Sequence, residues 1–310
     1  MPAAFFSSDE QRRADLRTCH EILEHGSKSF VAASRLLPKR LHDRTAALYA
    51  FCRVADDAVD LGTDANAALA RLHERLDHVY AGHPDDNPVD RAFADVVATC
   101  GIPETVPRAL LEGFAWDAEK RRYPTPEDLD TYCARVAATV GVMMALLFGE
   151  RSKVLVARAC DLGLAMQLTN ICRDVGEDAR ATRMYLPLDW LAEAGLDPDR
   201  IIAQPLHSEA LGTVVRRVLQ RADTYYRRAD SGMALYPADC RLGVRSARLI
   251  YSEIGRVVAR NNYDSVSRRA YTSKARKLLL LLRALRVRLY PGRASHEGAS
   301  PAAQFLVDSV

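Results

Sequence analysis

Two acidic segments stand out from otherwise apolar surroundings, and each repeats an aspartate at an interval of four residues. The first, RVADDAVD, contains Asp56, Asp57 and Asp60, and the second, QLTNICRDVGED, contains Asp174 and Asp178. Residues four apart lie on the same face of an α-helix. A desolvated carboxylate is costly unless a positive group holds it. The repetition therefore predicts two acidic helix faces that meet across a cavity holding cations.

Other polar residues extend each acidic face into a longer stripe. In the first segment the stripe is about 60° wide and consists of Tyr49, Arg53, Asp56 and Asp60. In the second it is about 80° wide and consists of Gln167, Asn170, Asp174 and Asp178. Hard oxygen ligands with amide neighbours suit magnesium, which keeps its waters and bridges to substrate phosphate. A solvated charged surface is the alternative for one stripe alone, and the recurrence of the pattern argues against it.

Arginines near the two stripes suit a diphosphate, because a guanidinium grips phosphate oxygens with a rigid fork. Arg53 and Arg173 lie beside the aspartates in sequence, and Arg183 and Arg268 are further candidates. A surface position that only favours solubility is the alternative for each of them.

A glycine lies within the second acidic segment, between Asp174 and Asp178. In a helix, Gly176 costs about 1 kcal/mol relative to alanine. It either loosens a turn so that the last aspartate reaches a metal, or lets another element pack closely against the helix.

The elements that must position these residues are helices. Ala, Leu, Arg and Glu dominate, and the alternating pattern of a strand is scarce. Helices are predicted over about 9–36 with a break near Gly26, and over 42–61. A further helix is predicted to end near Arg122, before Pro124, and another to run through the almost wholly apolar stretch that follows Pro126. Pro187 is predicted to end the helix of the second stripe. We therefore expect one all-α domain over residues 1–290, followed by a mobile tail over 291–310 that is rich in Gly, Ser, Ala and Pro.

The composition is that of an ordinary globular protein. The chain has 310 residues, 48% hydrophobic and 27% charged, with a formal net charge of +3. Its seven cysteines are scattered and form no CxxC pair, so we expect no disulfide framework and no zinc site. The N-terminus lacks the apolar core of a signal peptide, and the LLLLL run near the C-terminus is too short to span a membrane. These features predict a cytoplasmic protein.

The C-terminal region is basic and leucine-rich. It contains nine Lys or Arg and no acidic residue over 265–293. One interpretation is an ordinary last helix with its leucines in the core. The other is peripheral contact with anionic lipid at the inner face of the membrane. Nucleic-acid binding would need a clustered basic and aromatic face, which the sequence lacks, so no nucleic-acid partner is predicted.

Five segments in order, between about residues 19 and 290, carry a resemblance to the squalene/phytoene synthase family, and most to its bacterial phytoene synthase members. The first two are GSKSF with SRLLP, and ALYAFCRVADDAVD. The third and fourth are YCARVAATVG and AMQLTNICRDVGEDARATRMYLP. The fifth is IYSEIG with YDSVSRRAY. Their order and context make a chance match untenable.

The resemblance implies the isoprenoid synthase fold, a single-domain helical bundle around a deep central cavity. It implies a prenyltransferase, a 15-cis-phytoene synthase that joins two geranylgeranyl diphosphates head to head through prephytoene diphosphate. The metal ligands that it implies are Asp56, Asp57, Asp60, Asn170, Asp174 and Asp178. The substrate-binding residues that it implies are Ser27, Lys28, Ser29, Phe30, Tyr49, Arg53, Gln167, Asn170, Arg173, Arg183, Tyr185 and Arg268. It assigns catalysis to the five aspartates together with Tyr132 and Tyr251.

The same resemblance sets the expected cofactors and partners. Mg²⁺ is expected, with Mn²⁺ as an alternative. NADPH is not expected, because the implied reaction ends with the loss of a proton and not with the transfer of hydride. The absence of the GxG of a Rossmann fingerprint is weaker support. The partners are prenyl diphosphate substrates and a downstream carotenoid desaturase. The alternatives are a squalene or dehydrosqualene synthase acting on farnesyl diphosphate, and a non-catalytic prenyl-lipid-binding or assembly protein of the same fold.

Small side chains indicate which chain length the cavity accepts. Ala33, Ser34, Ala46 and Ala47 lie on the first two predicted helices, near the expected cavity. They would leave depth for a twenty-carbon tail, and tight packing between helices is the alternative. Where the family often reads VAG, this chain has Ala138, whose methyl group would either narrow the cavity or alter the packing.

Overall fold

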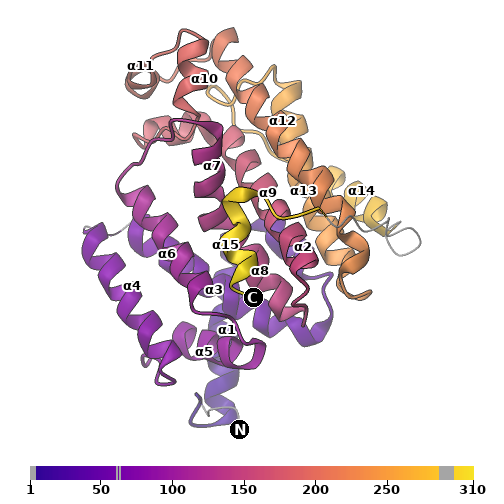
Figure 1. Ribbon diagram of the computed structural model, residues 1–310. Helices are drawn as coiled ribbons and strands as arrows, with labels where there is room; N and C mark the ends of the chain where they lie inside the picture. The colour runs from indigo at the N-terminus through magenta and orange to yellow at the C-terminus, as the bar shows by residue number, and fades with distance from the viewer. Residues whose placement is uncertain (1–4, 61, 63, 286–296) are drawn as a thin grey trace.

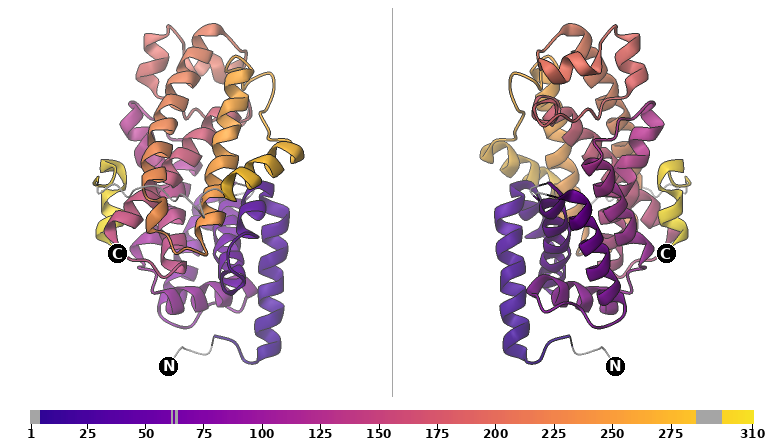
Figure 2. Two further views of the ribbon diagram at one scale, coloured as in Figure 1. Left: turned by 90° about the vertical axis from the view of Figure 1, so that its right-hand side faces the viewer. Right: turned by 90° about the vertical axis from the view of Figure 1, so that its left-hand side faces the viewer.

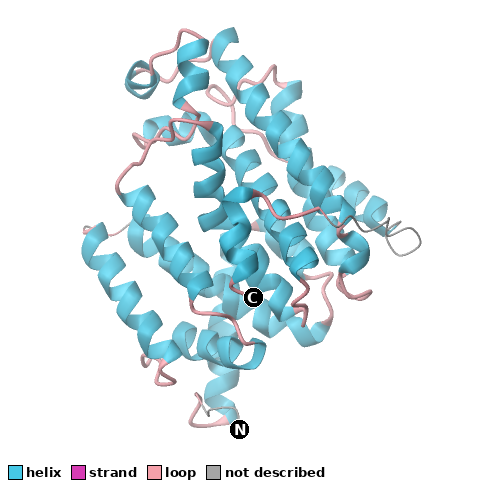
Figure 3. Ribbon diagram, viewed as in Figure 1, coloured by secondary structure: helices cyan, strands magenta, loops and turns pink. Residues whose placement is uncertain are grey.

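The computed structural model describes residues 5–60, 62, 64–285 and 297–310, and this part of the chain is helical with no strand (Figure 3). The α-helices are α1 Asp9–Gly26, α2 Lys28–Ser34, α3 His42–Asp60, α4 Ala65–Tyr80, α5 Pro88–Cys100, α6 Thr105–Ala118, α7 Pro126–Cys133, α8 Thr139–Leu147, α9 Lys153–Arg180, α10 Leu188–Glu193, α11 Pro198–Ala203, α12 Glu209–Ser231, α13 Arg241–Arg260, α14 Lys274–Ala284 and α15 Gln304–Asp308. The predicted all-α class is confirmed. Figure 1 shows the helices gathered around the long α9.

The predicted break near Gly26 is present, and it coincides with the cap of α2. Ser27 caps α2, because its hydroxyl oxygen accepts the N–H of Phe30 at 3.3 Å. A Cβ at position 26 would lie 2.1 Å from the hydroxyl oxygen of Tyr49, so the glycine leaves room for that side chain where it stands. The end of α1 is thus shaped around a residue of the first polar stripe.

Two helices end earlier than predicted. The helix before Pro124 ends at Ala118, and α9 ends at Arg180, well before Pro187. In each case a residue with left-handed backbone follows: Lys120 has φ 51° and Thr182 has φ 60°. Such residues stop a helix before a proline would.

The apolar helix predicted after Pro126 is interrupted by a π-helical turn. Its α-helical parts, α7 and α8, flank the π-helix Ala134–Ala138. Pro126–Leu147 and Lys153–Arg180 are long and apolar enough to cross a membrane by length and composition. Within the fold, however, 61% and 72% of their most apolar windows are buried, which is typical of core helices.

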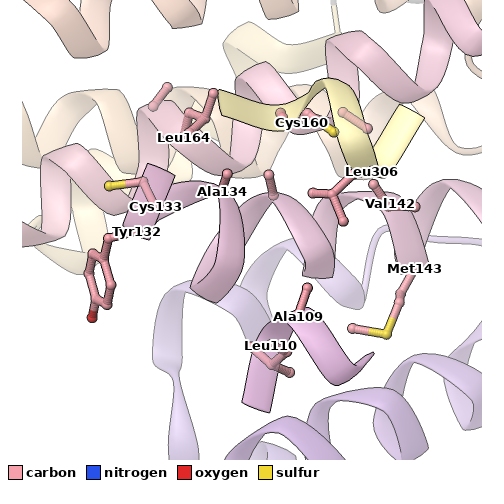
Figure 4. Close-up of a cluster of buried hydrophobic side chains, with 14 of the residues drawn as sticks. Ala109, Leu110, Tyr132, Cys133, Ala134, Val142, Met143, Cys160, Leu164 and Leu306 are labelled. Atoms are coloured by element: carbon pink, nitrogen blue, oxygen red, sulfur yellow. The ribbon is translucent and has the colours of Figure 1, made fainter. Parts of the chain in front are cut away.

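Glycines let these two core helices approach closely. A Cβ at Gly141 would lie 2.5 Å from the carbonyl oxygen of Ala159, and one at Gly163 would lie 2.5 Å from that of Ala137. Figure 4 shows the neighbouring core, with Ala134, Val142, Met143, Cys160, Leu164 and residues of α6 and α15. The same view shows Tyr132 extending away from this cluster.

The mobile tail predicted over 291–310 is wrong for residues 297–310, and residues 291–296 lie outside the described part. α15 packs on α8 and α9, and its Leu306 and Val307 are buried (Figure 1). The Gly298 carbonyl accepts hydrogen bonds from Arg158 at 2.8 Å and from Arg228 at 2.7 Å. Buried apolar side chains and these charge-assisted bonds outweigh the flexible composition.

Candidate active site

Both acidic stripes line one polar pocket. Asp56 and Asp60 reach it from α3, and three further oxygen-bearing side chains reach it from α9: Asn170, Asp174 and Asp178. The stripes therefore meet across a common space, as their spacing predicts. Asp57 is not among the lining residues, because it lies to the side and binds Arg53.

An apolar pocket adjoins the polar one. Its walls come from α2, the π-helix, α8, α9 and α13, and include Phe30, Ala33, Ser34, Val136, Val140, Met144, Leu162, Met166, Val244 and Ala247. Gln167, Asn170 and Tyr251 line both pockets. The two spaces thus adjoin at these three residues, one charged and the other apolar, which suits a molecule with an anionic head and a hydrocarbon tail.

Arginines neutralise part of the first stripe. Arg53 binds Asp57 at 2.6 Å between Nη2 and Oδ1, and reaches Asp56 only at 3.4 Å. Arg183 binds Asp60 at 2.6 Å, which joins α3 to the segment after α9. Burial, followed by the nearby charge of Asp60, raises the pKa of Asp56 to about 6. Asp56 is therefore a carboxylate that a further cation would stabilise.

The second stripe also contains one carboxylate that arginines neutralise and one that they do not. Burial opposes ionisation of Asp174, but hydrogen bonds from Arg173 and Arg269 outweigh it and lower the pKa of that carboxyl. Asp178 has no ion pair among the described residues. Burial and the charge of Asp174 raise the pKa of Asp178 to about 8. One carboxylate on each stripe, Asp56 and Asp178, thus lacks sufficient positive charge.

The donor set fits a hard divalent cation. Asn170 donates its amide N–H to Gln167 at 3.3 Å, and its buried Oδ1 has no hydrogen-bond partner. That oxygen and the carboxylates of Asp56 and Asp178 are ligands that magnesium prefers. In the described part of the chain, no three carboxylates are close enough to hold a metal by themselves. Magnesium tolerates this, because waters and substrate phosphates usually complete its shell.

A cluster of tyrosines surrounds an aspartate that sequence reasoning gave no role. The hydroxyls of Tyr132 and Tyr185 donate to Asp117 of α6, at 2.9 Å and 2.6 Å. The two rings stack with centroids 5.2 Å apart, and all three residues line the polar pocket. Burial raises the pKa of Asp117 to about 6, against the effect of the tyrosine hydrogen bonds. Asp117 could not be found from spacing, because no second acidic residue shares its helix face.

Most other predicted site residues lie at the two pockets. Ser27, Ser29 and Tyr49 line the polar pocket, and Phe30 lines the apolar one. Lys28 begins α2, and its side chain lies outside the described part.

Arg268, predicted to bind substrate, lies outside the residues that line the polar pocket. Its side chain is exposed and does not line the pocket, whereas Arg269 binds Asp174 with its Nε 2.8 Å from Oδ1. Two adjacent arginines on an irregular segment cannot be told apart by sequence, because no helical period sets the direction of their side chains.

Two of the four small residues are not at the cavity. Ala33 and Ser34 line the apolar pocket, whereas Ala46 and Ala47 are buried in the core away from it. The prediction that all four leave depth for a tail is therefore wrong for the α3 pair. Ala138 does not line either pocket, so its methyl group alters packing.

Gly176 is a packing glycine. α9 is α-helical through it, and its N–H donates to the Ser265 carbonyl at 3.1 Å. A Cβ there would lie 2.7 Å from the carbonyl oxygen of Val266. The glycine therefore admits the segment that carries Arg269 to Asp174.

Replacing this glycine tests the close approach. Gly176→Ala is expected to lower the free energy of unfolding by about 1–3 kcal/mol, because backbone atoms must move apart. Urea denaturation measures the change. Gly298→Ala is the matched control, since no atom lies within 4 Å of its added Cβ. Equal stability of the two variants would contradict the packing role.

Comparisons with known proteins agree with this arrangement. A sequence profile described as squalene/phytoene synthase matches residues 23–276. A phytoene synthase of Rhodobacter capsulatus is 53% identical over 271 residues, covering 86% of this chain and 80% of the relative. One of Cereibacter sphaeroides is 49% identical over 312 residues, covering 96% and 88%.

A solved structure shares the fold. A crystal structure of a dehydrosqualene synthase in complex with a ligand superposes with a TM-score of 0.83 and 31% sequence identity. The match covers 91% of this chain and 99% of that one. The expected isoprenoid synthase fold is confirmed by this likeness. With the profile, the relatives and the fold in agreement, the chain belongs to the squalene/phytoene synthase family.

Proposed function

We propose that this chain is a 15-cis-phytoene synthase, which joins two geranylgeranyl diphosphates head to head and releases both diphosphates. The observation that carries the proposal is the pair of adjoining pockets, charged on one side and apolar on the other, with Gln167, Asn170 and Tyr251 at their junction. The names of relatives that are 53% and 49% identical support the choice of product.

The residues that would hold magnesium are those of the polar pocket: Asp56, Asp60, Asn170, Asp174 and Asp178. When bound, magnesium supplies Lewis-acid neutralisation of the charge that develops on a departing diphosphate. Asp57, also predicted as a ligand, binds Arg53 and would act by orienting that arginine. Manganese as an alternative metal, and independence from NADPH, stay predictions.

The protein's own residues have three tasks in this chemistry. Arginines around the carboxylates, Arg53, Arg173, Arg183 and Arg269, would bind diphosphate oxygens and stabilise the leaving group. The apolar walls would exclude water, which would otherwise quench the allylic cation. The aromatic faces of Tyr132 and Tyr251 would stabilise that cation without attacking it.

The proposed reaction proceeds through two ionisations. The C–O bond of the first substrate breaks, and the double bond of the second attacks the resulting allylic cation. Loss of a proton closes the cyclopropane ring of prephytoene diphosphate, which still carries one diphosphate. A second ionisation, a rearrangement and the loss of another proton give phytoene. No reductant enters this sequence.

A second candidate is dehydrosqualene synthesis from farnesyl diphosphate. It is favoured by the solved dehydrosqualene synthase, whose fold superposes over nearly the whole of that structure. Transfer of the product to a carotenoid desaturase and a cytoplasmic location stay predictions, as does the non-catalytic alternative.

A product assay separates these functions. With magnesium and geranylgeranyl diphosphate, the purified protein is expected to form phytoene without NADPH, and EDTA is expected to abolish the reaction. Chromatography of the extracted hydrocarbons, run in parallel with farnesyl diphosphate, measures both. Formation of thirty-carbon products alone would favour the second candidate, and no product from either substrate would contradict both.

A further inference from the structure

The helix α14 buries one face and exposes another that is rich in leucine. Its inner face places Leu280 and Ala284 against Leu242, Leu249 and Ile250 of α13. On its outer face Leu278, Leu279 and Leu282 are 59%, 52% and 56% exposed, and Leu285 just beyond is 42% exposed. The interpretation that these leucines all lie in the core is therefore wrong. Leu278, Leu282 and Leu285 fall within about 60° of one another, as a continuous stripe.

Basic side chains flank this leucine stripe. Lys274 and Arg283 are exposed on opposite sides of it, and α14 contains no acidic residue. Tyr271, just before the helix, is 75% exposed. Leucines beside lysine, arginine and an aromatic ring are the composition of a surface that lies in the interface of an anionic bilayer.

α14 and the residues just before it also border the candidate active site. Tyr271, Thr272 and Lys277 line the polar pocket. The cluster beneath α14 is packed against Ala32 and Leu36, which lie in and just after α2, the helix that also lines the apolar pocket. Figure 2 shows α14, in amber, projecting from the side of the bundle. A surface that received α14 would therefore adjoin the polar pocket and lie beside α2, the helix that lines the apolar one.

We propose that the outer face of α14 docks on the surface of an anionic lipid bilayer. The leucines would enter the headgroup boundary, and Lys274 and Arg283 would bind lipid phosphates. Docking rests on these exposed side chains alone. Docking would allow the enzyme to release an apolar product directly into lipid, and this role rests on the proposed function.

A second copy of the chain is a poorer occupant of this face. In a two-fold dimer the same patch meets itself. The Lys274 and Arg283 side chains of one copy would then lie near those of the other copy, and they would repel each other. α14 has no acidic residue to compensate. Anionic lipid removes this repulsion, because it brings negative charge to both flanks of the stripe.

Vesicle sedimentation tests the docking. The full-length protein is expected to bind vesicles of phosphatidylcholine with about one third phosphatidylglycerol, and to bind pure phosphatidylcholine about tenfold less. The double variant Leu278→Glu and Leu282→Glu is expected to bind the anionic vesicles at least about tenfold less. Leu206→Glu is the matched control, because Leu206 is 71% exposed on the segment between α11 and α12. It should bind like the unchanged protein.

Further measurements keep the inference falsifiable. Lys274→Gln with Arg283→Gln is expected to remove most of the preference for anionic vesicles. Equal vesicle binding by the leucine variant and the unchanged protein would overturn the proposal. So would light scattering that shows the unchanged protein as a dimer and only the leucine variant as a monomer. Product formation in detergent is assayed separately. Its absence from every variant would contradict the proposed function, while the vesicle result would still decide the docking.

Discussion

The Asp56→Asn variant is expected to lose about 10³-fold in kcat/KM for geranylgeranyl diphosphate, with its fold intact. Asp56 faces the polar pocket, and burial with the charge of Asp60 raises its pKa to about 6. The native fold thus keeps a poorly compensated carboxylate there, and a neutral amide would bind a divalent cation more weakly. Steady-state kinetics at several magnesium concentrations measure the loss, and a higher magnesium requirement should accompany it.

The matched control lies on the same helix. Asp43 is in the first turn of α3, where its carboxylate is 57% exposed and binds His20 at 2.9 Å. Asp43→Asn makes the same chemical change away from the pocket, so it should keep kcat/KM within about twofold, as surface substitutions usually do. Equal activity of Asp56→Asn and Asp43→Asn would contradict the role of Asp56 as a metal ligand. Thermal unfolding of both variants excludes a general loss of structure.

Ser34→Phe is expected to shift selectivity from the twenty-carbon to the fifteen-carbon substrate by about 10²-fold. Ser34 lines the apolar pocket from α2, and its hydroxyl donates to the Val31 carbonyl at 3.1 Å. A benzyl side chain at this position would occupy space that the longer tail needs, whereas a shorter tail would still fit. The ratio of kcat/KM values for geranylgeranyl and farnesyl diphosphate measures the effect.

Two further variants are controls for that ratio of kcat/KM values. Ser34→Ala keeps the space open and should keep the selectivity. Arg35→Phe places the same ring one residue further on, where the native side chain is 69% exposed and binds Glu24. It should leave the ratio unchanged. If Ser34→Phe also leaves it unchanged, the tail of the substrate does not extend toward α2, and the argument from small residues fails.

Charge and spacing within single helices made much of the candidate site predictable. Asp56 with Asp60, and Asp174 with Asp178, share a helix face because α-helical geometry requires it, and their cost of burial required a common polar space. Gln167 and Asn170 follow from the same periodicity. Arg269 did not follow, because it lies on an irregular segment where no period sets side-chain direction. Asp117 did not follow either, because it meets Tyr132 of α7 and Tyr185 of the segment after α9 only through tertiary packing.

The sequence by itself determined the helical class, the two acidic stripes and the family, since each depends on local periodicity or on ordered motifs. The tertiary structure alone decided which faces are covered. Leu306 in the C-terminal tail is buried although the composition of that tail suggests mobility, and Leu278, Leu279 and Leu282 of α14 are exposed although their hydrophobicity suggests a core. The reason is physical: hydrophobic periodicity shows that a helix has an apolar face, but burial depends on which distant segments reach it. That information lies in the whole packing of the chain.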